Sequence, residues 1–525
     1  MLRMFNNKRR KMKTKSSLSV ALIATALCMS LVACSDENDA PEVSDVAYVW
    51  GTEGSVKTCD HLLFASDGKE DAHGNVIGNG DKEFIFKGKQ TLKRGTYLLR
   101  GWIYVAEGSE LTIEPGTVIK GEKESAASLI IEPGAKIFAQ GTAAQPIVFT
   151  SAQAKGSRRP GDWGGLILCG RALNNKGVLG QQIEGGPRTK HGGNDAADNS
   201  GVLSYVRVEF AGYPFQKDKE INAVTFGSVG SGTRVSHLQV SYSNDDSFEW
   251  FGGNVNCRYL VAFNGWDDEF DTDNGYSGKV QYALSIRDPR IADTSQSNGF
   301  ESDNDADGSL TQPFTSAVFS NVTFVGPMGR GGFENTPDYI NGGSMFPQNG
   351  SALGKYQAAM QIRRSSRLAC FNSVAMGYPI GLIIDAEKGG TQEYAKAGNL
   401  KLRNILFAGM EITGSDANKR YSDDLYDAAK KTEIDPSQAS FSSSFFMAQP
   451  GNRVFSQIAD LRLTGSNGDF PAIFPLADSP LLGAARFEDE LLSSGFDKVS
   501  YVGAFSGTAN WLEGWTEFDP QHADY

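Results

Sequence analysis

Acidic side chains in the middle of the chain repeat at a constant spacing. Residues 244–252 align with residues 266–274 at an offset of 22, and residues 298–304 form a third copy after a loop insertion near residues 288–297. The alignment produces two adjacent columns, one of phenylalanine (Phe248, Phe270, Phe300) and one of carboxylates (Glu249, Asp271, Glu301). Because neighbouring residues of a strand point to opposite faces, phenylalanines inside a stack of strands would place the carboxylates in one row outside it.

The predicted row of carboxylates is suited to calcium. Two carboxylates about 5 Å apart repel by roughly 3 kcal/mol at an effective dielectric constant near 20, but by under about 1 kcal/mol in open water. A row in a groove therefore needs a cation, a shared proton or an arginine partner. Clustered oxygen ligands favour Ca²⁺ over zinc or copper. The predicted metal ligands are Glu249, Asp268, Asp271, Glu301 and Asp303. The alternative is a set of acidic turns with Arg363 or Arg364 as a counter-charge.

The same region allows a catalytic interpretation. Paired carboxylates perform the acid and base steps of glycoside hydrolysis, and Asp246 and Asp268 are the candidate pair. Trp250, Trp266 and Arg363 are predicted to flank a cleft there and to contact a ligand. The sequence has no Gly-x-Ser-x-Gly, Walker or His-Glu-x-x-His motif, and it lacks the Gly-His-Gly and Arg-Ile-Lys motifs of polygalacturonases. We therefore expect ligand binding or a structural role, with a polysaccharide lyase or glycoside hydrolase as the alternative.

Short strands must position these residues. Residues 111–120 align with residues 129–138 at an offset of 18, each as a strand, a Pro-Gly turn and a second strand, and this offset predicts one coil. Further strands are predicted at residues 205–210, 318–325, 369–377 and 400–408. A single coil cannot bury its apolar side, so coils must stack, and near-constant coil lengths favour this over a β-sandwich. The predicted fold is all-β, a right-handed single-stranded parallel β-helix over residues 86–412.

Five segments resemble a known family. Residues 111–121, 162–167, 245–278, 501–505 and 511–516 are similar to those of predicted parallel β-helix lipoproteins from Bacteroidetes-type bacteria. The similarity covers roughly residues 90–518. It implies the fold and an extracytoplasmic location, and it implies no reaction.

The N-terminus has the pattern of a lipoprotein signal peptide. Residues 1–33 carry seven basic and no acidic side chains, and their apolar run ends at Leu31-Val32-Ala33-Cys34. The run is shorter than the roughly 20 residues of a membrane span, so cleavage before Cys34 is expected. This motif resembles the bacterial lipobox, which implies a lipid on Cys34 and anchoring in the outer membrane. The acidic stretch 35–39 resembles a surface-export signal. The alternatives to the lipobox are an ordinary signal peptide and an uncleaved anchor, and the alternative to the surface-export signal is a plain solvated tether.

Charge excludes one class of partner. Removal of residues 1–33 takes away seven of the 50 basic residues and none of the 62 acidic ones, so the net charge changes from −12 to −19. No basic run remains to neutralise phosphates, so we expect no nucleic-acid binding. The six cysteines form no zinc-binding pattern, and their wide spacing leaves open both disulfides and isolated buried thiols.

Both ends are predicted to cap the coils. Residues 34–85 form a tether and an N-terminal cap, and residues 413–525 form a C-terminal capping region with a helix at 423–431. The segment with Trp511 and Trp515 is predicted to cover the open end of the stack, with a sugar-stacking platform as the alternative. Together these features predict a lipid-anchored surface protein that binds a glycan or another extracellular ligand, or has a structural role.

Overall fold

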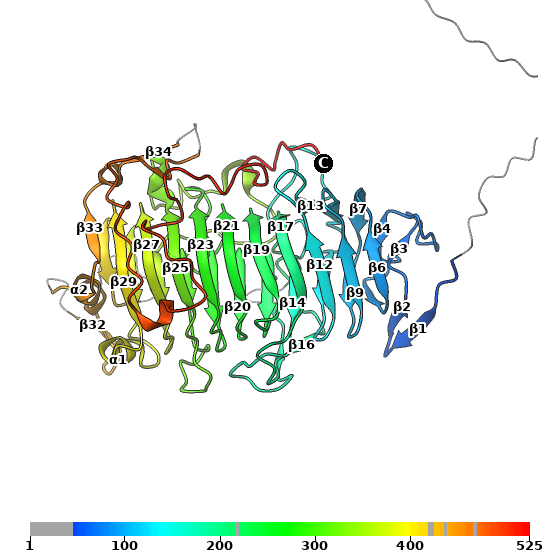
Figure 1. Cartoon of the computed structure of the whole chain (residues 1–525), viewed down its shortest axis with the longest axis horizontal. Coiled ribbons are helices and arrows are strands. Elements are labelled where there is room, and N and C mark those ends of the chain that lie inside the picture. Colours follow the sequence, from blue (N-terminus) through cyan, green and yellow to red (C-terminus); the bar gives the residue numbers. More distant parts are fainter. Residues whose placement is uncertain (1–45, 216–219, 418–424, 435–437, 466–469) are drawn as a thin grey trace, which may run out of the picture. The chain divides into compact units, whose positions relative to one another are not determined.

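Two long sheets of mainly parallel strands form the body of the protein (Figure 1). The computed structural model describes residues 46–215, 220–417, 425–434, 438–465 and 470–525. The first sheet contains, in spatial order, β1 (Trp50–Glu53), β2 (Val56–Cys59), β5 (Glu83–Phe86), β8 (Trp102–Val105), β11 (Ser128–Ile131), β14 (Leu166–Cys169), β18 (Val224–Gly227), β20 (Phe248–Phe251), β22 (Phe270–Asp273), β24 (Phe300–Ser302), β26 (Ala358–Ile362), β28 (Ile380–Ile384) and β30 (Ile412–Ser415).

The second sheet forms the facing wall. Its strands are, in spatial order, β3 (Leu63–Phe64), β4 (Val76–Ile77), β7 (Thr96–Leu99), β10 (Val118–Gly121), β13 (Ile147–Ser151), β17 (Gly201–Glu209), β19 (Arg234–Ser241), β21 (Asn256–Phe263), β23 (Lys279–Ile286), β25 (Val318–Val325), β27 (Ala369–Met376), β29 (Lys401–Ala408) and β33 (Arg453–Phe455). A side branch of β6 (Lys89–Leu92), β9 (Glu110–Ile113) and β12 (Lys136–Gln140) joins it at β17.

The remaining elements are short. They are the hairpins β15 (Gln181–Gln182) with β16 (Lys190–His191), β31 (Leu425–Asp427) with β32 (Thr432–Ile434), and β34 (Leu463–Thr464) with β35 (Phe474–Pro475), the helices α1 (Thr391–Lys396) and α2 (Phe441–Ala448), and the 3₁₀ turns Pro327–Arg330, Gly343–Met345, Ile458–Leu461 and Glu490–Leu492.

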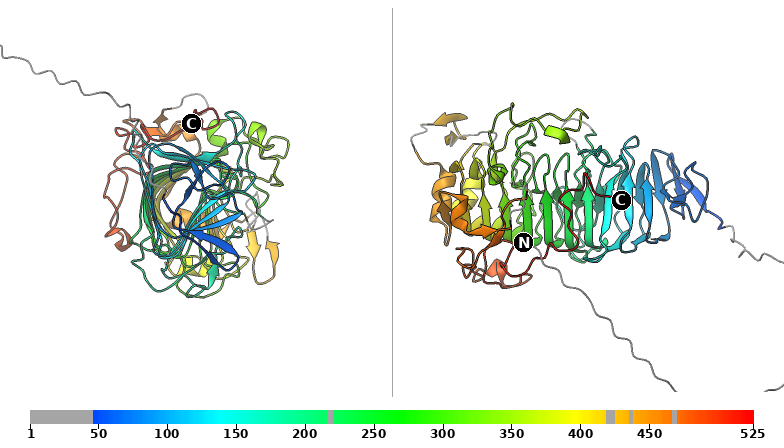
Figure 2. Two further views of the ribbon diagram at one scale, coloured as in Figure 1. Left: turned by 90° about the vertical axis from the view of Figure 1, so that its right-hand side faces the viewer. Right: turned by 90° about the horizontal axis from the view of Figure 1, so that it is seen from above.

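Successive coils stack as a parallel β-helix, which confirms the predicted all-β class. Every pairing in the two large sheets is parallel except β1 with β2 and β3 with β4. Apolar side chains from both sheets, such as Leu129, Phe248 and Leu260, fill one continuous interior core. The left view of Figure 2 looks along the stack from its β1 end. Each strand thus gains hydrogen-bond partners from the coils on either side, while the alternation of side chains supplies the core.

The 22-residue register is confirmed and the 18-residue register is wrong. Phe248 pairs with Phe270, and Phe270 pairs with Phe300. In contrast, Leu111 pairs with Ile137, 26 positions further on, whereas residues 129–131 belong to the first sheet. The two Pro-Gly turns occupy different corners of the coil, and both need a glycine at positive φ (Gly116 at 77° and Gly134 at 86°). A turn motif therefore specifies a local corner and not a position within the coil.

The long strands of the second sheet bend at one left-handed residue per coil. These residues have φ between 48° and 62°: Tyr205, His237, Tyr259, Tyr282, Asn321, Asn372 and Asn404. The four rings stack with centroids 4.2 to 4.9 Å apart. The amide of Asn404 donates to Oδ1 of Asn372 at 2.7 Å. Stacked rings and hydrogen-bonded amides therefore stabilise a conformation that non-glycine residues seldom adopt.

The C-terminal region caps the end with a helix and then covers one side. Helix α2 packs on the last coil, where Phe446 stacks on Phe407 at 4.0 Å. The segment after β35 runs back outside the second sheet (Figure 1). The N–H of Gly503 donates to the carbonyl of Asn372, and the N–H of Glu517 donates to Oε1 of Gln239. The prediction that the tryptophan segment covers the open end is wrong, because fully buried Trp515 packs on Tyr205 and His237.

Two further sequence predictions concern the ends and the cysteines. The helix predicted at 423–431 is wrong within the described residues, because residues 425–427 form β31 and a turn follows. The four described cysteines, Cys59, Cys169, Cys257 and Cys370, are buried free thiols, whereas Cys28 and Cys34 lie outside the described residues. No helix in the described part is both long and apolar enough to cross a membrane.

Candidate functional site

An acidic cleft lies outside the first sheet, alongside β20, β22 and β24. Its volume is about 1010 Å³, and ten carboxylates and two arginines line it: Glu184, Glu220, Asp245, Glu249, Asp267, Asp271, Asp273, Asp293, Glu301, Asp303, Arg363 and Arg364. A narrower recess of about 200 Å³ shares most of these residues and adds Asn222, Asp246 and Asp268. The predicted carboxylate row therefore lies in a groove and not on a convex face.

Strand alternation and turns position these carboxylates. Glu249 pairs with Asp271, which pairs with Glu301, while the neighbouring phenylalanines are fully buried in the core. The doublets Asp245-Asp246 and Asp267-Asp268 lie in the turns just before β20 and β22. The N–H of Asp268 donates to Oδ1 of Asp246 at 2.8 Å, and the N–H of Asn298 donates to Oδ1 of Asp268. One oxygen of each second aspartate therefore fixes the turn of the next coil.

Two groups of carboxylates have the spacing of a cation site. Asp245, Asp246 and Asp267 form one group and Asp246, Glu249 and Asp271 the other; in each, one oxygen per residue lies within 4.8 Å of the others. Calcium binds oxygens at about 2.3–2.6 Å, so two of its ligands lie no more than about 5 Å apart. Among the described residues, Oδ1 of Asp267, Asp271 and Asn222 has no hydrogen-bond partner. Each group therefore contains a carboxylate with one oxygen that has no hydrogen bond within the described part of the chain, and such an oxygen can bind calcium.

Electrostatics disfavour charge on these groups in the absence of a cation. Burial and, secondarily, neighbouring carboxylates raise the pKa values of Asp246, Glu249 and Asp271 well above their ordinary range. Burial also raises the pKa values of Asp268 and Asp273 to about 6. A bound divalent cation would reverse this effect, because it stabilises the ionised form.

The downstream end of the cleft is neutralised by arginines. Nε of Arg363 donates to Asp303 at 3.0 Å and its NH2 group pairs with Glu301, while Arg364 reaches Asp303 at 2.8 Å. The predicted metal set is therefore divided. Glu249 and Asp271 join the carboxylate groups, whereas Glu301 and Asp303 belong to an ion-pair network, as the alternative expected. Asp268 lies in the recess but in neither group.

The predicted tryptophan contacts are wrong. Trp250 is fully buried and stacks on Phe226 at 5.7 Å and on Tyr276 at 5.3 Å. Trp266 is also fully buried, beside Phe346 of the loop before β26. Neither ring is accessible to a ligand. Arg363 does line the cleft, although it is already paired.

Sequence reasoning missed several residues of the cleft and its recess, among them Glu184, Glu220, Asp293 and the three discussed next. Asp245 and Asp267 are the first members of the two aspartate doublets, and the 22-residue repeat of the doublet was a signal that could have found them. Asn222 precedes the apolar β18 strand and has no such repeat; its amide donates to Glu249.

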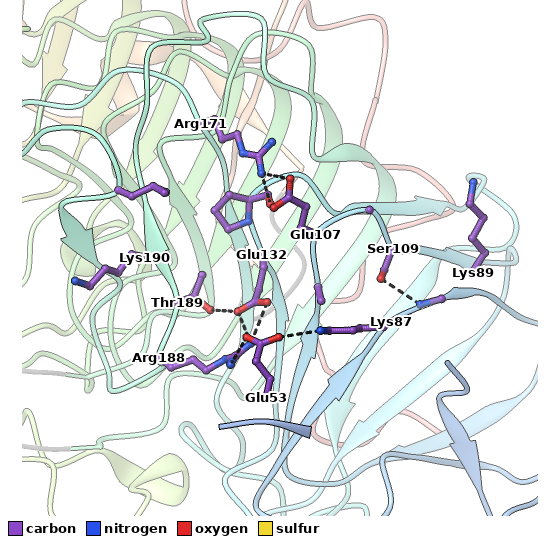
Figure 3. A pocket seen from close by; sticks show the side chains of 15 residues that line it. Glu53, Lys87, Lys89, Glu107, Ser109, Glu132, Arg171, Arg188, Thr189 and Lys190 are labelled. Atoms are coloured by element: carbon purple, nitrogen blue, oxygen red, sulfur yellow. Dashed lines mark hydrogen bonds and ion pairs between the residues drawn. The ribbon is translucent and has the colours of Figure 1, made fainter. Parts of the chain in front are cut away.

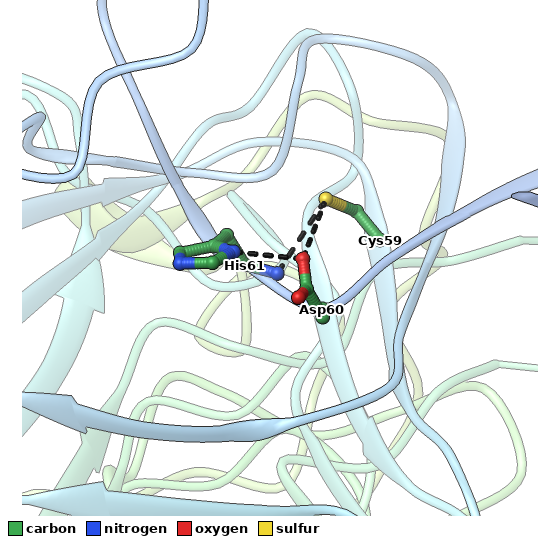
Figure 4. A group of neighbouring side chains, drawn as sticks. All are labelled: Cys59, Asp60 and His61. Atoms are coloured by element: carbon green, nitrogen blue, oxygen red, sulfur yellow. Dashed lines mark hydrogen bonds and ion pairs between the residues drawn. The ribbon is translucent and has the colours of Figure 1, made fainter. Parts of the chain in front are cut away.

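A different set of potential ligands lies near the N-terminus. Cys59, Asp60 and His61 bring a sulfur, an oxygen and a nitrogen within 4.8 Å of one another (Figure 4). Nδ1 of His61 lies 2.7 Å from Oδ1 of Asp60, and burial raises the pKa of Cys59 to about 11. The neutral thiol and this hydrogen bond are sufficient to account for the arrangement.

Comparison with known proteins supplies a family. The family described as a pectate-lyase-like beta helix domain matches residues 85–445. The crystal structure of pectate lyase Pel9A is similar at 13% sequence identity and a TM-score of 0.36, covering 76% of this chain and 88% of that one. No curated protein matches the chain. Because the family match at residues 85–445 spans most of its length, the chain belongs to the family of pectate-lyase-like β-helix domains.

Proposed function

We propose that this protein is an outer-membrane lipoprotein that binds an extracellular glycan in the acidic cleft with calcium as the bridging ion. The observation that carries the proposal is the presence of two carboxylate groups, in each of which one oxygen per residue lies within 4.8 Å of the others. None of their five members has an arginine or lysine partner among the described residues. Calcium would offset the negative charge of these carboxylates and keep open coordination positions for a ligand.

A glycan suits the remainder of the cleft. Its volume of about 1010 Å³ is at the upper end of the range for small-ligand sites. Sugar hydroxyls would donate to the carboxylates, and sugar oxygens would complete the coordination of the ion. An anionic glycan would be repelled by the metal-free cleft, so its binding would depend on calcium.

The experiment is a glycan array probed with and without calcium. We expect specific binding in calcium, its loss in chelator, and its loss in Asp271→Asn. The matched control is Asp338→Asn, because Asp338 is exposed and outside the cleft. Calcium-independent binding, or equal binding by both variants, would contradict the proposal.

An enzyme is the second candidate, favoured by one observation. Asp268 has a pKa of about 6 through burial, close to the working range of a general acid or base, and it lies beside Asp246. If bound polysaccharides accumulate new reducing ends or unsaturated uronates during the incubation, the protein is a carbohydrate-active enzyme. A ligand recovered intact favours binding alone.

The proposed anchor has its own test. Cys34 follows the lipobox-like Leu31-Val32-Ala33, and no other cysteine has this context. We expect fatty-acid labelling of the native protein and its complete loss in Cys34→Ala, which should leave the protein in the soluble fraction. Cys59→Ala is the control and should retain the label. Absence of label from the native protein would contradict both the lipid anchor and the proposed attachment to the membrane.

A further inference from the structure

A second pocket lies at the corner that follows β5, β8, β11 and β14. Its volume is about 880 Å³, and five cations and three carboxylates line it: Lys87, Lys89, Arg171, Arg188, Lys190, Glu53, Glu107 and Glu132 (Figure 3). The segment between β14 and β17 supplies Arg188, Thr189 and Lys190 to this pocket and Glu184 to the acidic cleft. The two sites thus share one covering segment but have opposite charge.

A fixed network forms one part of the pocket. Arg188 bonds to Glu53 at 3.0 Å and to Glu132 at 3.1 Å, and its guanidinium lies 4.8 Å from the ring of Tyr104. Thr189 donates to Glu132 at 3.1 Å, and Lys87 pairs with Glu53 at 3.0 Å. The Glu132 side chain is only 15% exposed. These groups offer fixed carboxylate oxygens that accept hydrogen bonds from hydroxyls.

The other three cations are available to a ligand. Lys190 has no ion-pair partner in the described part of the chain, and no dashed line reaches it in Figure 3. Arg171 is held by the carbonyl of Pro133 and by Glu107, whose side chain is 70% exposed. Lys89 pairs with Glu110 at 3.1 Å, and their side chains are 71% and 36% exposed. Exposed pairs of this kind contribute about 0–1 kcal/mol, so a ligand can replace them.

We propose that this pocket binds a phosphate monoester carried by a saccharide. The ligand must displace Glu107 from Arg171, and a phosphate monoester carries about 1.5 to 2 negative charges at neutral pH against one for a carboxylate. The pocket is larger than a single inorganic ion needs, and Glu53, Glu132 and Thr189 are placed to bond sugar hydroxyls. The site requires no calcium and goes beyond the function proposed for the acidic cleft.

Titration calorimetry of the full chain in chelator tests this proposal. The probes are glucose 6-phosphate, inorganic phosphate, glucuronate and glucose. We expect glucose 6-phosphate to bind most tightly, and more weakly as sodium chloride increases. Lys190→Gln and Arg171→Gln should each weaken it by about tenfold, the equivalent of one charge-assisted hydrogen bond. Lys498→Gln, an exposed lysine outside the pocket, should leave affinity unchanged.

Each alternative result has a defined meaning. No heat with millimolar glucose 6-phosphate, or equal affinity in all three variants, overturns the site. Equal affinity for inorganic phosphate removes the saccharide from the proposal, and tighter binding of glucuronate overturns the preference for phosphate. Because calcium is absent, these outcomes are independent of the acidic cleft. Unchanged thermal unfolding of Lys190→Gln would show that its weaker binding does not reflect misfolding.

Discussion

Calcium should stabilise the native protein, and Asp271→Lys should abolish this effect. An ion held by Asp246, Glu249 and Asp271 binds the folded chain, so the free energy of unfolding rises with the logarithm of calcium concentration. The gain is about 2.7 kcal/mol at 100 times the dissociation constant. Lysine removes one ligand oxygen and places an ammonium group where the ion would lie. In chelator, the same change should stabilise the protein or be neutral, because it reduces repulsion among the remaining carboxylates.

Unfolding curves in calcium, in chelator and in added sodium chloride measure this effect. Sodium should reproduce little of it, and Asp338→Asn should respond to calcium as the native protein does. Identical curves for the native protein in calcium and in chelator would leave only acidic turns and arginine pairs, and the metal site would have to be abandoned.

The dependence on pH provides a second check on the same site. Burial raises the pKa values of Asp268 and Asp273 to about 6 and that of Glu249 well above its ordinary range. A carboxyl whose pKa is raised in the folded state binds more protons there than when unfolded, so metal-free stability should fall as pH rises through about 6. The pKa values of the proposed ligands Asp246, Glu249 and Asp271 are all raised. Calcium must displace the protons of these three carboxyls, so the stability gained from calcium should be larger at about pH 7 than at about pH 5. An equal gain at both would contradict ligation by these carboxyls.

The carboxylate row was predictable because it follows from two local regularities. The offset of 22 residues aligns Phe270 with Phe248, and strand alternation then directs Asp271 outward. The same alternation predicts that Trp250, two residues after Phe248, points inward. Assigning it to a ligand contact therefore contradicted the pattern used for its neighbours.

The pairing of the arginines with the carboxylates could not be predicted from the periodicity of the sequence. Arg363 reaches Glu301 and Asp303 from the end of β26, but a long insertion, residues 326–357, separates β26 from the preceding strand β25. An insertion of that length removes the regular spacing by which coils are aligned. It also buries Trp266, since Phe346 of this loop packs on the indole. Residues that depend on long insertions therefore needed the structure.

Phe270→Ala should destabilise the protein by about 3–5 kcal/mol, the usual cost of removing a fully buried aromatic ring. Phe270 has no exposed surface and contacts the rings of Phe248 at 5.7 Å and Phe300 at 6.0 Å. Rings from the facing sheet, Phe319 and Phe324, complete its surroundings. Its removal leaves a cavity at the centre of the core, and the stacked strands on both sides restrict the movement that would fill it.

Denaturant unfolding of the native protein and two variants tests this expectation. Phe138→Ala makes the same chemical change on β12, but at an outward-facing and partly exposed position, so it should cost well under half as much. Phe270→Ala should lower the free energy of unfolding by a similar amount in calcium and in chelator, because the ring faces away from the carboxylates. A loss below about 0.5 kcal/mol is typical of a surface position. It would mean that the phenylalanine column is not in the core, and the outward direction of Glu249 and Asp271 would then lose its physical basis.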